Sequence, residues 1–139
     1  MSTSKSKQRI LNILLVDDDE MLLETIDHLL TKKGHTIVTC SNAHDGIVAL
    51  KKGKFDVMIT DVVMPDAKGT ALAEIARVRF PNLPIVVISA DKNNADAWTG
   101  HGTKGTAIVL KPFTLDHLVE TIFKVVGQPT ANRHGPTLS

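Results

Sequence analysis

The chain has 139 residues, which is enough for one domain with a substantial core and too few for two. Apolar residues make up 42% of the sequence and charged residues 22%, as in ordinary soluble globular proteins, and the net charge of +1 gives no electrostatic reason to expect nucleic-acid binding. The single cysteine excludes an intrachain disulfide and a cysteine-based zinc cluster, and no apolar stretch is long enough to cross a bilayer, so we expect a cytoplasmic protein without membrane contact.

The first half of the chain begins with a polar and basic segment, residues 1–9, which has no apolar core of a secretory signal and is predicted to be a disordered leader. Beyond it, apolar runs typical of buried parallel strands alternate with segments in which apolar residues recur at helical spacing. Asp18 or Asp19 can cap the first helix and Asn42 the second. The predicted order is strand 12–16, helix 20–33, strand 36–40, helix 43–51 and strand 57–60.

The second half continues the alternation except in residues 91–106. That segment is rich in glycine and asparagine, which have poor helix propensity, so we expect at most a short helix around residues 95–99. Residues 127–139 combine glycine and proline with few apolar side chains and are predicted to be a disordered tail. The remaining predicted elements are helix 69–79, strand 85–88, strand 107–110 and helix 115–126, which Thr114 caps.

Strands that alternate with helices indicate the α/β class. Parallel strands need crossover helices, and these cover both faces of the sheet, so we predict a five-stranded, doubly wound parallel sheet in one domain, residues 10–126. In such sheets, ligands bind beyond the carboxyl ends of the strands, where the winding reverses. Five reactive or charged residues lie at the carboxyl ends of predicted strands: Asp17, Asp18, Asp61, Ser89 and Lys111. The sequence therefore predicts a site at this edge of the sheet.

The residue types at this edge suit phosphoryl transfer. An aspartate carboxylate can attack phosphorus to form an acyl phosphate, and a lysine can stabilise the charge of the transition state. A hard divalent cation prefers carboxylate oxygens, which Asp17 and Asp18 supply beside Asp61. Because close carboxylates repel one another, we expect the cluster to bind protons more tightly when no metal is present.

Four motifs in this order resemble the receiver domain of two-component response regulators, of the chemotaxis-regulator type. The resemblance covers residues 10–126 and implies a flavodoxin-like sheet with strand order 2-1-3-4-5 and about five helices. The motifs are Val16-Asp17-Asp18-Asp19, Asp61-Val62-Val63-Met64-Pro65 with Gly69, Ile88-Ser89-Ala90, and Lys111-Pro112-Phe113.

The resemblance implies a role for each matching residue. Asp61 would be the phosphoacceptor, and Mg²⁺ would bind to Asp17, Asp18, Asp61 and the backbone carbonyl of Val63. Lys111 would pair with the phosphoryl oxygens or with Asp61, and the peptide bond before Pro112 would be cis. Ser89 would donate its hydroxyl to the phosphoryl group. The implied donor is a phosphohistidine on a histidine kinase or a histidine phosphotransfer protein, and the implied output is a conformational change read by a partner protein. Such a domain catalyses only its own phosphorylation and dephosphorylation and is otherwise no enzyme.

One position departs from the family pattern. The family usually carries an aromatic residue on the fifth strand that moves together with the serine or threonine of the fourth, and here that position is Ile108. The switch pair would then be Ser89 and Ile108, without the aromatic ring. This departure puts in doubt the output face formed by the segment around residues 95–99, strand 107–110 and helix 115–126, through which a homodimer could also form.

Two other readings remain open at this point. A degenerate receiver could serve as a protein-binding or dimerisation module, which the missing aromatic residue favours and the intact acids and lysine oppose. A haloacid-dehalogenase-like phosphatase would use Asp17, Asp19, Ser89 and Lys111, but it leaves the motif that starts at Asp61 unexplained. The six histidines lack metal-site spacing and are predicted to lie at the surface or its boundary.

Overall fold

A computed structural model of the protein describes residues 9–61, 63–64, 67–90 and 105–127. Most of the predicted leader, the predicted short helix around residues 95–99 and the predicted tail beyond Gly127 lie outside these residues. Arg9, which the prediction placed in the leader, is described, and its guanidinium lies 3.1 Å from the Asp56 carboxylate.

The sheet has the five predicted parallel strands, in the order β2-β1-β3-β6-β7. Counting only these five strands along the chain, this is the predicted order 2-1-3-4-5, which is confirmed. The central strands are buried from end to end, as continuous apolar runs predict. The strands are β1 (Asn12–Val16), β2 (Thr36–Cys40), β3 (Val57–Asp61), β6 (Ile85–Ser89) and β7 (Thr106–Leu110).

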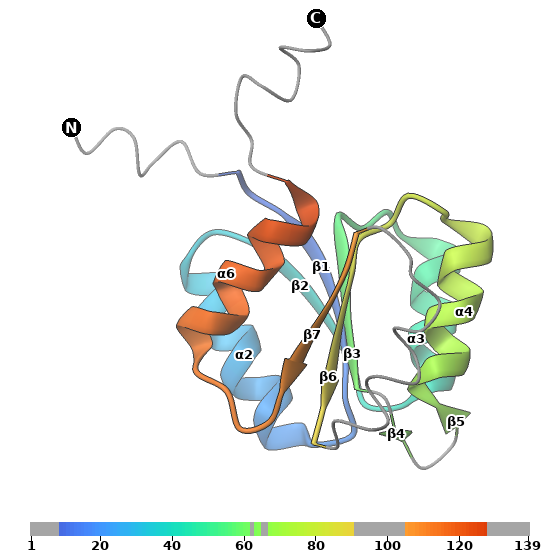
Figure 1. Ribbon diagram of the computed structural model, residues 1–139, viewed down its shortest axis with the longest axis horizontal. Helices are drawn as coiled ribbons and strands as arrows, with labels where there is room; N and C mark the ends of the chain where they lie inside the picture. Colours follow the sequence, from blue (N-terminus) through green and yellow to red (C-terminus); the bar gives the residue numbers. More distant parts are fainter. Residues whose placement is uncertain (1–8, 62, 65–66, 91–104, 128–139) are drawn as a thin grey trace, which may run out of the picture.

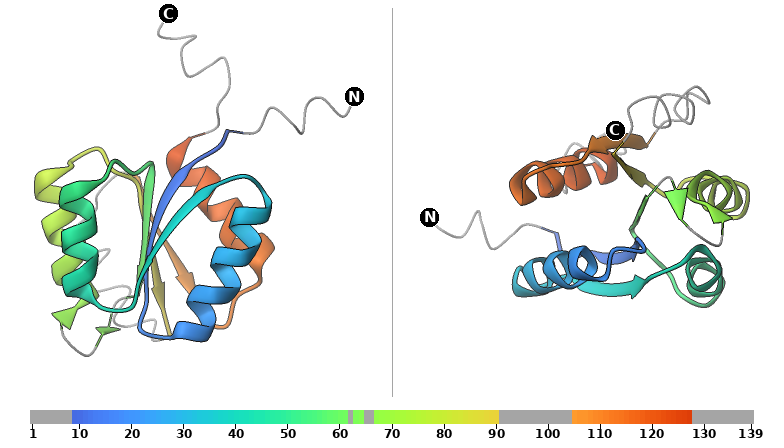
Figure 2. Two further views of the ribbon diagram at one scale, coloured as in Figure 1. Left: turned by 180° about the vertical axis from the view of Figure 1, so that it is seen from behind. Right: turned by 90° about the horizontal axis from the view of Figure 1, so that it is seen from below.

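Helices cover both faces of this sheet. Two of them, α2 (Glu20–Lys32) and α6 (Leu115–Val126), lie on one face, and α3 (Ala43–Lys52) and α4 (Gly69–Arg79) lie on the other (Figures 1 and 2). The predicted caps form, because the side chains of Asp19, Asn42 and Thr114 accept hydrogen bonds from backbone amides in the first turns of α2, α3 and α6.

Each face of the sheet carries its own apolar core. Under α2 and α6, one cluster joins alternate residues of the strands to the inner stripes of both helices, for example Ile13, Ile59, Ile26 and Ile122. The residues of opposite parity, such as Leu14 and Met58, pack against α3 and α4. This alternation follows from the two-residue period of a strand, and it fixes which face each later side chain meets.

One feature of the fold was not predicted. A short antiparallel pair, β4 (Val63–Met64) and β5 (Ala67–Lys68), forms between β3 and α4. Strands of two residues are too short to leave a periodic pattern in the sequence, so the sequence analysis did not predict this pair.

No helix in the described part of the chain combines the length and apolar character needed to cross a membrane.

The surface prediction for the histidines was wrong for His35. Its side chain is buried, its Nδ1 accepts a hydrogen bond of 3.0 Å from the Leu11 amide, and its ring centroid lies 5.8 Å from that of Phe123. Burial lowers the pKa of His35, and nearby Lys33 lowers it further. A ring that accepts from a backbone amide is neutral at that nitrogen, so His35 is a structural group between β1, β2 and α6.

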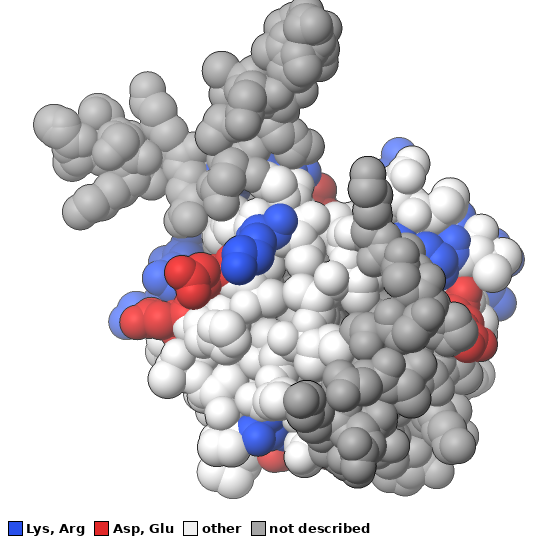
Figure 3. Space-filling model, in the orientation of Figure 1, with Lys and Arg blue, Asp and Glu red and all other residues white. Residues whose placement is uncertain are grey.

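On the face shown in Figure 3, the charged side chains of the described residues are of both signs. On the face seen in Figure 3, blue and red side chains of the described residues alternate on a largely uncharged surface, without a continuous basic stripe.

Candidate functional site

The register of the sheet brings the predicted residues to one edge. Val16 is paired with Thr60, so Asp17 and Asp61, one residue further on, end neighbouring strands. On the next strands, Ser89 is paired with Leu110, and the Lys111 amide donates 2.8 Å to the Ser89 carbonyl. Four strands therefore bring their carboxyl ends together at one end of the sheet. This place includes the neighbouring strands β1 and β3, between which the winding of the sheet reverses.

Asp17 is fully buried and its orientation is fixed. Its Oδ1 accepts a hydrogen bond of 2.9 Å from the Asp19 amide at the start of α2. Its Oδ2 lies 3.3 Å from Lys111 Nζ but makes no hydrogen bond of good geometry within the described part of the chain. A buried carboxylate oxygen with this one electrostatic contact can still accept a cation.

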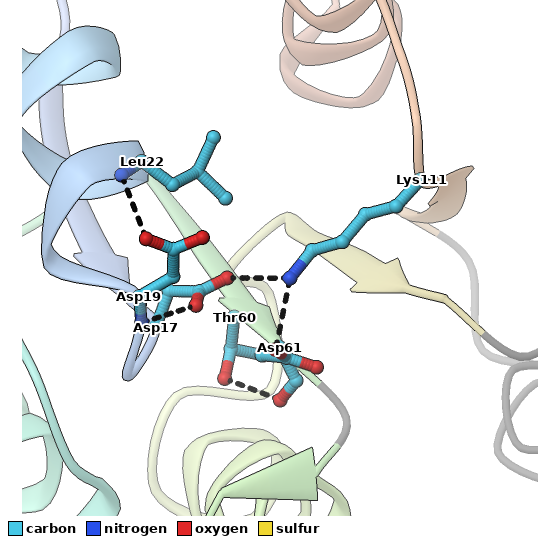
Figure 4. A network of polar contacts seen from close by, with 6 residues as sticks. All are labelled: Asp17, Asp19, Leu22, Thr60, Asp61 and Lys111. Carbon is cyan, nitrogen blue, oxygen red and sulfur yellow. Dashed lines mark hydrogen bonds and ion pairs between the residues drawn. The ribbon is translucent and has the colours of Figure 1, made fainter.

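Lys111 joins the two buried aspartates. Its ammonium lies 3.3 Å from Asp17 Oδ2 and 3.2 Å from Asp61 Oδ2, as Figure 4 shows. The Lys111 side chain is 26% exposed, so part of it is accessible to solvent. The peptide bond between Lys111 and Pro112 is cis, as predicted.

Asp17 and Lys111 each affect the pKa of the other. Burial raises the pKa of Asp17, and the charge of Asp61 adds to the rise, while the Asp19 amide and Lys111 act in the opposite direction. The predicted gain in proton affinity is confirmed for Asp17, but its main cause is burial rather than repulsion. For Lys111, burial lowers the pKa, but Asp17 and Asp61 together outweigh burial, so the net pKa is raised and the side chain stays charged.

The acids fit a divalent cation by position and by type. Asp17, Asp18 and Asp61 each offer one carboxylate oxygen, and these three atoms lie within 4.8 Å of one another. Asp18 is exposed, whereas the other two are buried, so the group opens towards solvent on one side. An all-oxygen set with open positions suits Mg²⁺, which keeps several of its waters.

The remaining predicted residues lie nearby with different roles. Ser89 is buried at the end of β6, and its backbone is tied to Lys111. Ile108 is partly buried on β7, where it packs against the core under α3 and α4. Val63 is the first residue of β4, two positions after Asp61.

Sequence reasoning missed Thr60. This residue was counted within an apolar run, but it is a fully buried polar side chain, and its Oγ1 donates 3.0 Å to the Asp61 carbonyl. The available signal was its place as the single hydroxyl in an otherwise apolar strand, directly before the key aspartate.

The comparisons with known families match this geometry. The family model of the response regulator receiver domain matches residues 13–123, which include all four strand ends. The chain is 30% identical over 117 residues to YcbL of Bacillus subtilis, an uncharacterized transcriptional regulatory protein, and this match covers 84% of the chain and 51% of the relative. It is 32% identical over 112 residues to the transcriptional regulatory protein GlrR of Escherichia coli, covering 80% of the chain and 25% of the relative. The chain thus spans about half the length of the first relative and a quarter of the second.

Solved structures give the same result. A response regulator receiver protein from Sinorhizobium medicae is 31% identical, with a TM-score of 0.76, covering 85% of this chain and 95% of that one. A response regulator receiver domain protein from Methanospirillum hungatei aligns with a TM-score of 0.78 at 23% identity, covering 85% and 94%, and supports the fold.

Proposed function

Because the chain belongs to the response regulator receiver domain family, we propose that it accepts a phosphoryl group on Asp61 from a phosphohistidine. The donor would be a histidine kinase or a histidine phosphotransfer protein. One observation carries the proposal: the Lys111 ammonium lies 3.3 Å from buried Asp17 and 3.2 Å from Asp61 at the carboxyl edge of the sheet. A lysine held between two carboxylates is already placed to meet the oxygens of a group that arrives on one of them.

The proposed step is a transfer from nitrogen to oxygen. A carboxylate oxygen of Asp61 attacks phosphorus, an O–P bond forms, the N–P bond breaks, and the departing histidine nitrogen takes up a proton. Lys111 and the Ser89 hydroxyl would hold oxygens of the transferred group. Mg²⁺, when bound, would supply positive charge for the phosphoryl oxygens, and Asp17, Asp18, Asp61 and the Val63 carbonyl are the residues that would hold it.

The proposed output is a change of conformation that a downstream partner protein recognises. Such a domain takes one phosphoryl group from each phosphohistidine onto its own aspartate and does not turn over a separate substrate. The aliphatic Ile108 is already packed against the core, so the proposed switch relies on Ser89 and the backbone link between Ser89 and Lys111. A homodimer through β7 and α6 remains a prediction, and the third part of that face, around residues 95–99, lies outside the described residues.

Intact-protein mass spectrometry tests the proposed function directly. The protein is incubated with acetyl phosphate and Mg²⁺, beside a metal-free sample and the variant Asp61→Asn. We expect one phosphoryl adduct that requires both Mg²⁺ and Asp61. Asp116→Asn, which changes an aspartate in the first turn of α6, serves as the matched control and should be labelled like the wild type.

The same experiment separates the proposal from the binding-module alternative, which the replacement of the usual aromatic residue by Ile108 favours. A folded protein that forms no adduct with acetyl phosphate or with a phosphorylated histidine donor would contradict the proposed chemistry. The acids and lysine would then serve only to hold the strand ends together.

A further inference from the structure

Thr60 places a polar hydroxyl inside a fully buried strand. Thr60 is 1% exposed, in a strand whose five residues are all buried. A valine has the same shape, an equal preference for strands and no polar atom to bury. A buried hydroxyl costs free energy unless it makes a hydrogen bond, and this one donates 3.0 Å to the carbonyl of Asp61 (Figure 4).

This bond indicates how the backbone leaves the strand. In a regular ladder, carbonyls lie in the plane of the sheet and side chains stand on its faces. Thr60 has the parity of Met58, so its side chain stands on the face covered by α3 and α4. A hydroxyl on that face reaches the next carbonyl when the carbonyl has turned out of the plane, and the bond therefore fixes the peptide unit that follows Asp61.

That peptide unit connects two groups of the proposed site. On its amino side is Asp61, the proposed acceptor and metal ligand. Two residues further along the chain is Val63, where β4 begins and whose carbonyl is the remaining proposed metal ligand. A rotation of the peptide after Asp61 would move both groups relative to each other.

We propose that Thr60 is a positioning residue, whose hydroxyl locks the peptide after Asp61 so that the acceptor carboxylate and the Val63 carbonyl hold one Mg²⁺ together. This inference rests on the proposed function. It also gives the two buried aspartates corresponding supports, since the Asp19 amide fixes the carboxylate of Asp17 in the same way that the Thr60 hydroxyl fixes the backbone of Asp61.

The test compares Thr60→Val, Thr60→Ser and Thr121→Val. Thr121 is the matched control, because it is also buried and its Oγ1 also donates to a backbone carbonyl, that of His117, but within α6. The measurements are the Mg²⁺ dissociation constant by titration calorimetry, the initial rate of adduct formation with acetyl phosphate, and the thermal midpoint of unfolding.

We expect Thr60→Val to weaken Mg²⁺ binding by about three- to tenfold and to slow adduct formation by a similar factor, as for the loss of one hydrogen bond. Thr60→Ser keeps the hydroxyl and should stay within about twofold of the wild type in both measurements. Thr121→Val should lower the midpoint of unfolding without changing either measurement.

Two results would overturn the inference while leaving the proposed function intact. In the first, Thr60→Val binds Mg²⁺ and forms the adduct like the wild type. In the second, Thr60→Ser, which keeps the hydroxyl, is impaired as much as Thr60→Val, which would assign the effect to the packing of this side chain rather than to its hydroxyl. A wild type that neither binds Mg²⁺ nor forms the adduct would instead reject the proposed function, and the inference with it.

Discussion

His35 at the amino end of β2 and Asp17 beyond the carboxyl end of β1 are both buried, but their surroundings differ in kind. His35 is neutral and bonds to the backbone amide of Leu11. Asp17 faces the charge of Lys111 and, beyond it, the charge of Asp61. The hydrogen bond of His35 is therefore to the main chain, whereas Asp17 is also held against opposite and like charges.

Arg77 is a second, partly buried polar group near the amino end of the sheet that bonds mainly to the main chain. It lies near the amino end of the sheet, where its guanidinium donates to the carbonyls of Pro81 and Leu83 and to the Thr106 hydroxyl at the start of β7. Its Nε has no hydrogen-bond partner among the described residues, and burial lowers its pKa. At this end, even a cation is held mainly by backbone oxygens, an arrangement that stabilises a fixed loop.

The charges at the carboxyl end of the sheet favour the binding of a cation. Three carboxylates lie close together there and one lysine contacts two of them, so negative charge exceeds positive charge within a few ångströms. Such an arrangement costs stability when nothing is bound and gains it when a cation arrives. We therefore expect substitutions at the carboxyl end to change phosphoryl transfer and Mg²⁺ binding. Substitutions at the amino end should change only the free energy of unfolding.

The largest expected effect is on chemistry at the carboxyl end. Lys111→Met removes the cation that faces both aspartates, and loss of a donor of this kind typically slows a reaction by about a hundredfold or more. The rate of adduct formation with acetyl phosphate measures the effect. Lys124→Met, which changes a lysine in the last turn of α6, is the control and should retain the wild-type rate. Equal rates for the two variants would remove Lys111 from the proposed chemistry.

The next effect is on stability and depends on the ligand. We expect Mg²⁺ to raise the free energy of unfolding, by about 2.7 kcal/mol at a hundredfold excess over its dissociation constant. Urea denaturation with and without Mg²⁺ measures the gain. Asp18→Asn removes an exposed member of the acidic group and should abolish most of the gain. A gain that is equally large in Asp18→Asn would place the binding elsewhere on the protein.

A loss of stability of similar or smaller size is expected at the amino end. His35→Leu leaves the Leu11 amide without its acceptor, which should lower the free energy of unfolding by about 1 to 3 kcal/mol. The rate of adduct formation should not change, since His35 lies at the opposite end of the sheet from Asp61. His117→Leu, at a side chain that is 54% exposed, provides the control for losing an imidazole. A slower phosphoryl transfer in His35→Leu would show that the two ends are coupled.

The sequence predicted the carboxyl end better than the amino end for a physical reason. Charged residues directly after apolar runs are conspicuous, and the geometry of a parallel sheet brings successive strand ends together. The sequence alone therefore places Asp17, Asp61 and Lys111 together. The strand order could not be worked out from periodicity and came from the resemblance to a family.

The groups that escaped prediction act through the backbone. His35 accepts from an amide 24 positions away, and Thr60 donates to the carbonyl of the following residue. Neither bond leaves a periodic or compositional signal, because the partner is a peptide group that every residue has. The β4–β5 pair escaped for a similar reason, since four residues cannot display a pattern.

The smallest effect concerns pH, and the two ends should respond with opposite sign. The pKa of His35 is lowered from 6.5 in the folded protein, so its contribution to stability is present above that value and is lost as the pH falls below it. The pKa of Asp17 is raised from 3.8, so its contribution is present below that value and is lost as the pH rises through the folded pKa. Each group can change the free energy of unfolding by at most about 1.4 kcal/mol per pH unit.

Denaturation of the metal-free protein between pH 4 and pH 8, at about half-unit steps, separates the two contributions. Relative to the wild type, His35→Leu should lose less stability as the pH falls below 6.5, because the unfolded variant has no imidazole to protonate. Asp17→Asn should lose less stability as the pH rises above 3.8, because no buried carboxyl remains to ionise. If both variants changed the slope in the same direction, the contrast between a neutral His35 at the amino end and a charged Asp17 at the carboxyl end would be wrong.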